Sequence, residues 1–295
     1  MPELPEVETI VRELNKTKPP IIGVGFFDVW TDNPKMIKKP KDFEQFKKII
    51  KGKKIQKIWR RGKNIIFDLS ENYSLLIHQK LTGHLLFGKW EFKNGFWKTK
   101  TKGPLEDKIN SYIHLLFTLD NDWMLALSDL RKFAKVELWE SDQLINSKEF
   151  KNLGPEPLEE AFTFEKFKEV IQKTQGKIKQ VLMDQTIIAG IGNIYSDEIL
   201  WEAKINPFKK VNQLNDKELK RIYQAMKKIL KKAVEAGGES ISDFRRISGE
   251  KGGFDPLRKV YRREGQSCFR CGAIIKRVQI RSRSAHFCPK CQSLE

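Results

Sequence analysis

The chain has 295 residues, of which 39% are hydrophobic, so it is long enough for two domains with real cores and a small accessory module. Its 56 Lys and Arg outnumber 38 Asp and Glu, and the formal net charge of +18 favours polyanions such as nucleic acid as partners. No apolar run approaches the roughly 18 residues that cross a bilayer, and Glu3, Glu6 and Glu8 stand where a signal peptide would carry Lys or Arg. We therefore expect a cytoplasmic protein with no membrane partner, and a monomer by default.

The N-terminal part is predicted to be mostly β-structure. Residues 3–15 form an amphipathic helix pattern, and the following strand-like runs are separated by turn formers: 21–30, 54–69, 73–87, 112–119 and 123–140. The segment 88–111 is rich in Lys, Trp and Gly without clear periodicity, and we interpret it as a loop or insertion. These runs predict a β-rich domain over residues 1–150.

Helical patterns follow a predicted hinge at Gly154-Pro155-Glu156-Pro157. One helix pattern starts near a Thr163 cap, and its apolar positions are Phe164, Phe167, Val170 and Ile171. A second contains Leu219, Ile222, Met226, Ile229 and Leu230, and Gly237-Gly238 closes it. We expect a helical domain over 151–240, a connecting loop region over 241–260 and a Cys-bearing module over 261–295.

All four cysteines lie in that last module, as Cys268-x2-Cys271 and Cys288-x2-Cys291. Two Cys-x-x-Cys turns can complete a tetrahedral Zn²⁺ site, and four protein ligands leave no open position, so the one zinc ion is predicted to be structural. Two disulfides are the alternative, which an intracellular location disfavours. The basic residues between the pairs indicate a finger that grips phosphates, and they are Lys276, Arg277, Arg281 and Arg283.

The N-terminus offers a candidate nucleophile. Removal of Met1 would expose the secondary amine of Pro2, and an α-amino group titrates at about 7.7–8.0, so part of it is unprotonated at neutral pH. Glu3 and Glu6, on the first helical turn, could supply acid–base chemistry. The alternative is structural, because Pro and Glu also favour the first turn of a helix.

Four separated motifs resemble the formamidopyrimidine-DNA glycosylases: the opening MPELPEVET, Arg60-Arg61-Gly62-Lys63, GIGNIYSDEILWEAKINP over 190–207, and the four-cysteine finger ending CPKCQ. The resemblance covers the chain except 88–111. It implies an α+β fold, with an N-terminal β-sandwich-like domain and its flanking helix, a helical helix-two-turn-helix domain and a C-terminal zinc-finger β-hairpin. It also implies a base-excision-repair enzyme that removes oxidised purines and cleaves the strand, acting on double-stranded DNA that contains an oxidised base or an abasic site.

The resemblance also assigns catalytic residues. Pro2 matches the nucleophile that attacks C1′ of the lesion nucleotide through a Schiff base, Glu3 the general acid and Glu6 a supporting carboxylate. Lys63 matches a phosphate ligand and proton donor in β-elimination, and Arg283 a phosphate ligand in δ-elimination.

Further matches are expected to contact DNA. Leu81, Arg131 and Phe133 match a wedge that fills the gap left by the flipped base, and His78 is a further candidate contact. Lys173, Lys179 and Asn193 match backbone contacts, and residues from about 238 to 256 match a lesion-capping loop.

Departures from the family pattern leave the lesion preference open. Leu81 replaces the usual Met, Ala134 a Gly, Lys251 a Pro and Gly253 an aromatic residue. The alternatives are an oxidised-pyrimidine glycosylase of the endonuclease VIII type, a catalytically silent damaged-DNA-binding protein, and a zinc-ribbon RNA-binding protein.

Overall fold

The computed structural model describes residues 1–241, 243–280 and 282–294. Ser242, in the segment matched to the capping loop, and Arg281, in the predicted finger, lie outside the described residues. The chain forms two compact units: Met1–Lys151 with Ala236–Asp255, and Asn152–Glu235 with Pro256–Glu295. The four domain ranges expected from the sequence stay a prediction.

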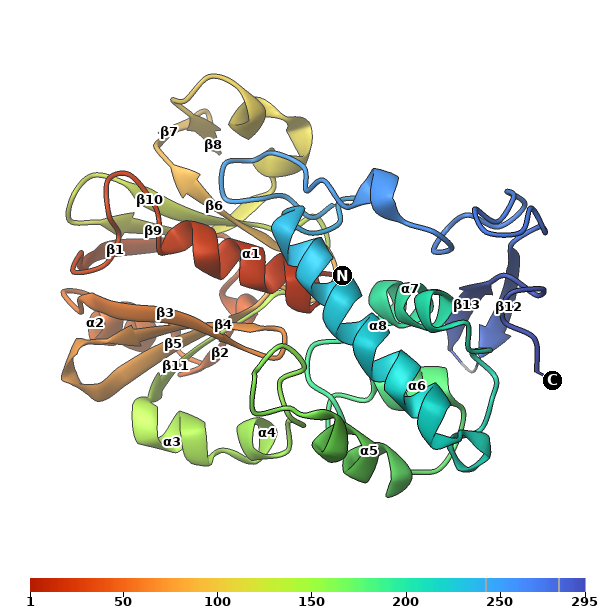
Figure 1. Ribbon diagram of the computed structural model, residues 1–295. Coiled ribbons are helices and arrows are strands. Elements are labelled where there is room, and N and C mark those ends of the chain that lie inside the picture. The colour runs from red at the N-terminus through yellow and green to blue at the C-terminus, as the bar shows by residue number, and fades with distance from the viewer. Residues whose placement is uncertain (242, 281, 295) are drawn as a thin grey trace. The chain divides into compact units, whose positions relative to one another are not determined.

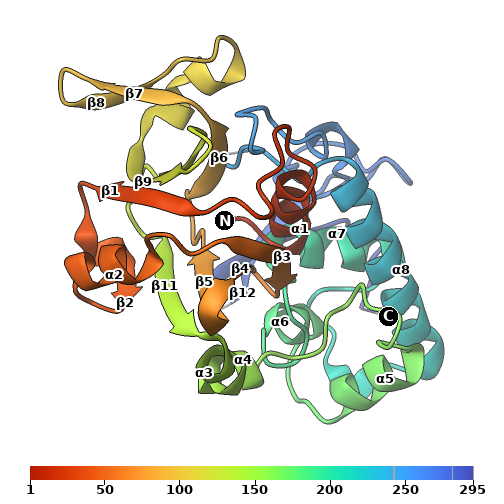
Figure 2. The same cartoon turned by 90° about the vertical axis from the view of Figure 1, so that its left-hand side faces the viewer.

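The first unit contains two sheets, which Figure 2 shows with the helices around them. The four-stranded antiparallel sheet has the order β1 (Phe26–Thr31), β9 (Ile113–Leu119), β10 (Met124–Ser128), β6 (His84–Gly88). The five-stranded sheet has the order β2 (Ile37–Lys39), β11 (Lys135–Glu140), β5 (Tyr73–His78), β4 (Asn64–Leu69), β3 (Ile55–Arg61), and only β2 pairs in parallel. The predicted strands are thereby confirmed.

One hydrophobic core joins both sheets to two helices. Phe117 of β9 and Phe67 of β4 are fully buried in it, as are Ile10 of α1 (Leu4–Leu14) and Phe46 of α2 (Phe43–Ile50). Alternate residues of a strand point to opposite faces, so the period-two runs in the sequence place one face in this core. The predicted helix over 3–15 is confirmed, whereas α2, α3 (Ser141–Asn146) and α4 (Lys148–Lys151) were not predicted.

The segment 88–111 was interpreted as a loop or insertion, and the loop alternative is wrong. The segment forms a β-hairpin of β7 (Trp90–Lys93) and β8 (Phe96–Thr99), followed by the 3-10 helices η3 (Pro104–Glu106) and η4 (Lys108–Ser111). Asn94 and Gly95 make the turn with φ values of 52° and 84°, the left-handed pair that a two-residue hairpin requires. Trp97 packs edge-on against Trp30 of β1, with ring centroids 5.6 Å apart, so the insertion is a folded part of the unit.

The second unit is helical and ends in a small hairpin (Figure 1). It contains α5 (Phe164–Gln172), α6 (Ile178–Met183), α7 (Asn193–Ala203), α8 (Asp216–Glu235) and the hairpin of β12 (Lys276–Ile280) and β13 (Arg283–Phe287). Thr163 caps α5 by accepting from the N–H of Lys166 at 3.4 Å, and α8 buries a continuous apolar stripe, so both predicted helices are confirmed. The remaining 3-10 helices are η1 (Pro34–Met36), η2 (Ser70–Asn72), η5 (Val211–Gln213) and η6 (Asp255–Leu257).

Among the described residues, no helix combines the length and the apolar character needed to cross a membrane.

Candidate active site

The start of α1 gathers the predicted catalytic groups of the N-terminus. Pro2 is buried, and Glu3 and Glu6 are only 2% and 1% exposed. The Glu6 carboxylate accepts two backbone hydrogen bonds, from Glu3 N–H at 2.7 Å and from Glu239 N–H at 2.8 Å. Glu6 therefore holds the backbone next to Pro2 and ties it to a segment that is 233 residues away in the chain.

Two glycines let that distant segment approach Glu6. Gly238 has a φ of 79°, and a Cβ there would lie 3.0 Å from both Cγ and Oε1 of Glu6. A Cβ on Gly252 would collide with the carbonyl oxygens of Gly237 and Gly238. The sequence analysis identified Gly237-Gly238 only as the end of a helix, but close approach to Glu6 is a second reason for glycine at 238.

Lys63 lies at the tight turn between β3 and β4, and it is 8% exposed. Arg60 donates to the carbonyl oxygen of Gly62 at 2.9 Å and to Glu8 of α1 at 3.0 Å, so it links this turn to the helix that begins at the N-terminus. Burial alone would raise the pKa of Glu8, but hydrogen bonds from Arg12 and Arg60 lower it. Glu8 and Arg60 thus hold the turn against α1, a contact that the sequence analysis did not predict.

The structure brings the predicted wedge residues together on two adjoining loops. Asp129 accepts from the Thr82 hydroxyl and, at 3.2 Å and 2.7 Å, from the N–H groups of Arg131 and Ala134. This buried carboxylate therefore joins the loop carrying Leu81 to the loop carrying Arg131 and Phe133. The Arg131 guanidinium lies 4.7 Å from the centre of the Phe133 ring, and Phe133 is 51% exposed, which is compatible with the predicted wedge role.

His78, at the end of β5, is neutral at physiological pH. Its Nδ1 accepts from Lys80 N–H at 3.0 Å, and burial, together with the charges of Lys80 and Lys63, lowers its pKa to about 3. A contact from His78 to DNA would therefore use the Nε2–H group as a hydrogen-bond donor without a full positive charge.

His84, the first residue of β6, is expected to make the stability of the protein depend on pH. Burial lowers its pKa to about 4, against 6.5 in an unfolded chain. Because the folded pKa is depressed, the unfolded state binds the proton first as pH falls, and stability is lost between about pH 6.5 and pH 4. Between pH 7.5 and pH 5 we expect protonation of this group to lower the free energy of unfolding by about 2 kcal/mol. Urea unfolding of wild type and His84→Gln at both pH values measures this loss of stability. An equal pH dependence of the two proteins would contradict the role of His84.

In the second unit, Lys179 and Asn193 lie beside each other. The Lys179 ammonium, 1% exposed, forms an ion pair with Asp197 of α7 and lies 3.5 Å from the carbonyl oxygen of Asn193. The other oxygen of Asp197 accepts from both the N–H and Nδ1 of His286, at 2.9 Å and 3.0 Å. The Oδ1 atom of Asn193, which begins α7, is buried without a hydrogen-bond partner. A buried carbonyl oxygen left unpaired in this way is typical of a site that receives a water molecule or another hydrogen-bond donor.

A surface cleft of about 230 Å³ brings Lys179 and Arg283 together. Its other lining residues are Gln180, Met183, Asp184, Ile280 and Ser282. Arg283 begins β13 and is exposed, so it is free to reach a phosphate in this cleft. Lys173 is separate from this group, since it ends α5 and pairs with Glu169 of the same helix at 2.6 Å.

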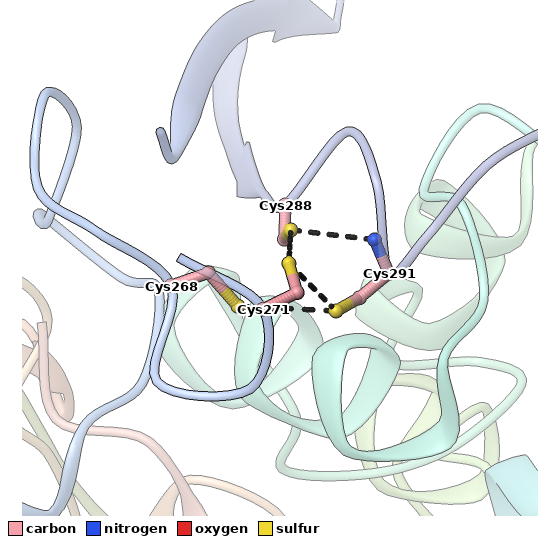
Figure 3. Close-up of side chains that lie close together, drawn as sticks. All are labelled: Cys268, Cys271, Cys288 and Cys291. Carbon is pink, nitrogen blue, oxygen red and sulfur yellow. Dashed lines mark hydrogen bonds between the residues drawn. The ribbon is translucent and has the colours of Figure 1, made fainter. Parts of the chain in front are cut away.

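The four cysteines form one cluster, and Figure 3 shows their sulfurs turned toward one another. All four Sγ atoms lie within 4.8 Å of each other, with separations of 3.9 Å for Cys268–Cys291, 3.4 Å for Cys271–Cys288 and 3.3 Å for Cys271–Cys291. A zinc ion with Zn–S bonds of about 2.3 Å needs sulfurs about 3.8 Å apart, whereas a disulfide needs about 2.05 Å. The cluster therefore fits Zn²⁺, and the disulfide alternative is wrong.

Three family models match the chain. They are described as the formamidopyrimidine-DNA glycosylase N-terminal domain over residues 1–136, the formamidopyrimidine-DNA glycosylase H2TH domain over 153–245, and the zinc finger found in FPG and IleRS over 265–294. A formamidopyrimidine-DNA glycosylase of Pelotomaculum thermopropionicum is 38% identical over 295 residues, which is 100% of both chains.

Solved structures agree with these matches. The complex of Lactococcus lactis Fpg with DNA containing an abasic site has a TM-score of 0.85 and 37% identity, with 99% of each chain covered. The complex of Lactococcus lactis Fpg (MutM) with Fapy-dG-containing DNA has a TM-score of 0.84 and 37% identity, with 99% of this chain and 100% of that chain covered.

Three parts define the class of zinc-finger DNA glycosylases. They are a domain of two sheets that begins with α1, a helix-two-turn-helix domain and a four-cysteine finger. The chain belongs to the formamidopyrimidine-DNA glycosylase family. The predicted α+β fold and the single structural zinc ion are confirmed.

Proposed function

We propose that this protein is a bifunctional base-excision-repair enzyme that removes oxidised purines, chiefly 8-oxoguanine and formamidopyrimidines, and then cleaves the DNA strand. The observation that carries the proposal is the start of α1, where Pro2 is buried beside Glu3 and Glu6 fixes the surrounding backbone. Full-length similarity to formamidopyrimidine-DNA glycosylases supports the class of substrate. We include an intracellular location in the proposal, because the substrate is damaged DNA, and we take a monomer as the default state.

Pro2 is the nucleophile of the proposed mechanism. After removal of Met1, its secondary amine attacks C1′ and displaces the base, and opening of the sugar ring gives an iminium ion. Glu3 serves as general acid, and its position is supported by the hydrogen bond from its own N–H to Glu6. Loss of a proton from C2′ then expels the 3′-phosphate with Lys63 as proton donor, and Arg283 assists expulsion of the 5′-phosphate.

DNA binding in this proposal uses both units. Leu81, Arg131 and Phe133 fill the gap left by the extruded base, which offsets part of the few kcal/mol lost on unstacking. The start of α7 at Asn193, where a helix N-terminus favours an anion, and the cleft lined by Lys179 and Arg283 support a phosphate site in the second unit. His78 and Lys173 contribute further backbone contacts, and the segment from 238 to 256 caps the lesion. The zinc ion holds the finger and takes no part in the chemistry.

Borohydride trapping tests the proposed nucleophile. We expect purified protein, incubated with an 8-oxoguanine:cytosine duplex and borohydride, to form a covalent adduct, because reduction of the iminium makes the protein–DNA bond permanent. Peptide mapping should place the bond on Pro2, and protein that retains Met1 should form no adduct. A duplex with an oxidised pyrimidine serves as the comparison substrate.

Each other outcome points to a rival. An adduct that maps to a lysine would remove Pro2 from the mechanism. Tight duplex binding without any adduct, even on an abasic site, would indicate a silent DNA-binding protein. Faster excision of the oxidised pyrimidine would move the substrate class to that of endonuclease VIII.

A further inference from the structure

The insertion between β6 and β9 contacts the same segment that docks on Glu6. Asn110 is 1% exposed and lies at the end of this insertion, in η4. Its Nδ2 donates to the carbonyl oxygens of Pro104 at 2.7 Å and Gly249 at 3.2 Å, and its Oδ1 lies 2.9 Å from Nε2 of His84. One buried amide therefore joins the insertion, β6 and the segment Ala236–Asp255, which are far apart in sequence.

Gly249 fits this contact because it has no side chain. Its φ is 85°, and a Cβ there would lie 2.7 Å from Nδ2 of Asn110 and 2.9 Å from the backbone nitrogen of Leu105. The backbone of the turn is thus pressed directly against the insertion. Neutral His84 donates its Nε2–H to the Asn110 oxygen, which orients the amide so that its NH₂ group faces Gly249.

The turn from 246 to 250 is held on two further sides. Arg246 forms an ion pair with Glu13 of α1, and the same carboxylate accepts from Ile247 N–H at 3.2 Å. Phe87 of β6 donates its N–H to Ile247 O at 2.9 Å. With α1, β6 and the insertion on three sides, this turn is a fixed point of the first unit.

The fixed turn is connected to Glu6 through the rest of the segment. Gly252 N–H donates to the Ser240 hydroxyl at 2.8 Å, and Phe254 N–H donates to Gly238 O at 3.0 Å. Glu239, between Ser240 and Gly238, donates its N–H to Glu6. A shift of the turn therefore moves the backbone around Glu239, which donates the hydrogen bond to Glu6.

We propose that Asn110 is a positioning residue, through which the insertion holds the segment Ala236–Asp255 in its docked conformation before DNA binds. The inference rests on the proposed function, in which this segment caps the damaged base. Preorganisation of the segment lowers the cost of ordering it around the base, so the insertion acts on base excision. An abasic nucleotide offers no base to hold, so strand cleavage at a preformed abasic site does not depend on Asn110.

Two rates measured on Asn110→Ala test the proposal. We expect single-turnover excision from an 8-oxoguanine duplex to fall about tenfold, because misplacement of a supporting segment has effects of this order or larger. Cleavage of an abasic-site duplex should stay within about twofold of wild type, on the same scale of effects. Gly249→Ala disturbs the same contact from the other side and should give the same split. Ser111→Ala, whose hydroxyl donates to Lys108 O within the insertion, serves as control.

The outcomes separate the inference from the function on which it rests. Wild-type protein that fails to excise 8-oxoguanine would refute the proposed function. If wild type is active and both rates fall equally in Asn110→Ala and Gly249→Ala, or neither rate changes, the positioning role is wrong. Hydrogen exchange at the amides of 246–250 should be faster in Asn110→Ala than in Ser111→Ala, and unchanged exchange would also overturn the inference.

Discussion

Glu6→Gln is expected to reduce base excision about a hundredfold and to lower stability by about 1–3 kcal/mol. The Glu6 carboxylate satisfies two buried N–H groups, those of Glu3 and Glu239, with two different oxygens. A glutamine has one acceptor oxygen, so its NH₂ group must face one of these donors. The unpaired N–H raises the free energy of the folded state, because either Glu3 beside Pro2 or Glu239 loses its hydrogen bond to residue 6.

Single-turnover excision at saturating enzyme and urea unfolding measure the two effects. Glu44→Gln is a matched control, since Glu44 lies in the first turn of α2 and is exposed, and it should leave both quantities unchanged. Folded Glu6→Gln protein that excises 8-oxoguanine within threefold of the wild-type rate would show that this carboxylate does not position the nucleophile.

Local patterns explain which parts of the structure the sequence predicts well. The helix α1, the long helix α8 and the strands follow from apolar periodicity over a few turns or residues, and the zinc site follows from two Cys-x-x-Cys turns. The hairpin in the insertion also had a local signal, because Asn94-Gly95 stands between two pairs of aromatic residues. The Lys-, Trp- and Gly-rich composition without clear periodicity instead favoured a loop or insertion.

Contacts between residues that are far apart in the chain could not be predicted from any short stretch of sequence. The hydrogen bond from Glu239 to Glu6 joins residues 233 apart, and the one from Asn110 to Gly249 joins residues 139 apart. Asp129 likewise connects two loops whose roles came only from the family resemblance. Such residues look like ordinary turn or surface positions in sequence, because their chemistry is fixed only when the sheets have packed.

Charged residues inside the second unit show the same limit. The sequence did not show that the ammonium of Lys179 pairs with Asp197 inside the unit, and the fully buried Glu198 was not singled out. The carboxylate of Glu198 accepts from the N–H groups of Lys259, Val260 and Tyr261 at 2.8–3.0 Å, and burial raises its pKa. Consecutive acidic residues on α7 thus hold β13 and the chain that enters the finger.

Zinc removal is expected to unfold the finger and to weaken binding to an abasic-site duplex by about a hundredfold. The apolar cluster that packs the finger is small, and it consists of Trp201, Val260, Cys268, Ile275 and Cys288. So few side chains cannot offset the entropy of ordering the finger, whereas a structural zinc ion contributes about 10–16 kcal/mol. If Arg277 and Arg283 bind phosphates as proposed, loss of the finger removes these contacts, and each charge-assisted hydrogen bond contributes about 1.5–3 kcal/mol.

Fluorescence anisotropy with a labelled abasic-site duplex, before and after chelation, measures the loss, and Zn²⁺ added back should restore the affinity. Cys271→Ser should behave as the chelated protein does, while Ser293→Ala, an exposed substitution beside the last zinc turn, should bind as wild type. Because Glu198 anchors residues 259–261 without metal, the helices α7 and α8 should keep their circular dichroism signal after chelation. Metal-free protein that binds the duplex with unchanged affinity would show that the finger folds without zinc or contributes nothing to binding.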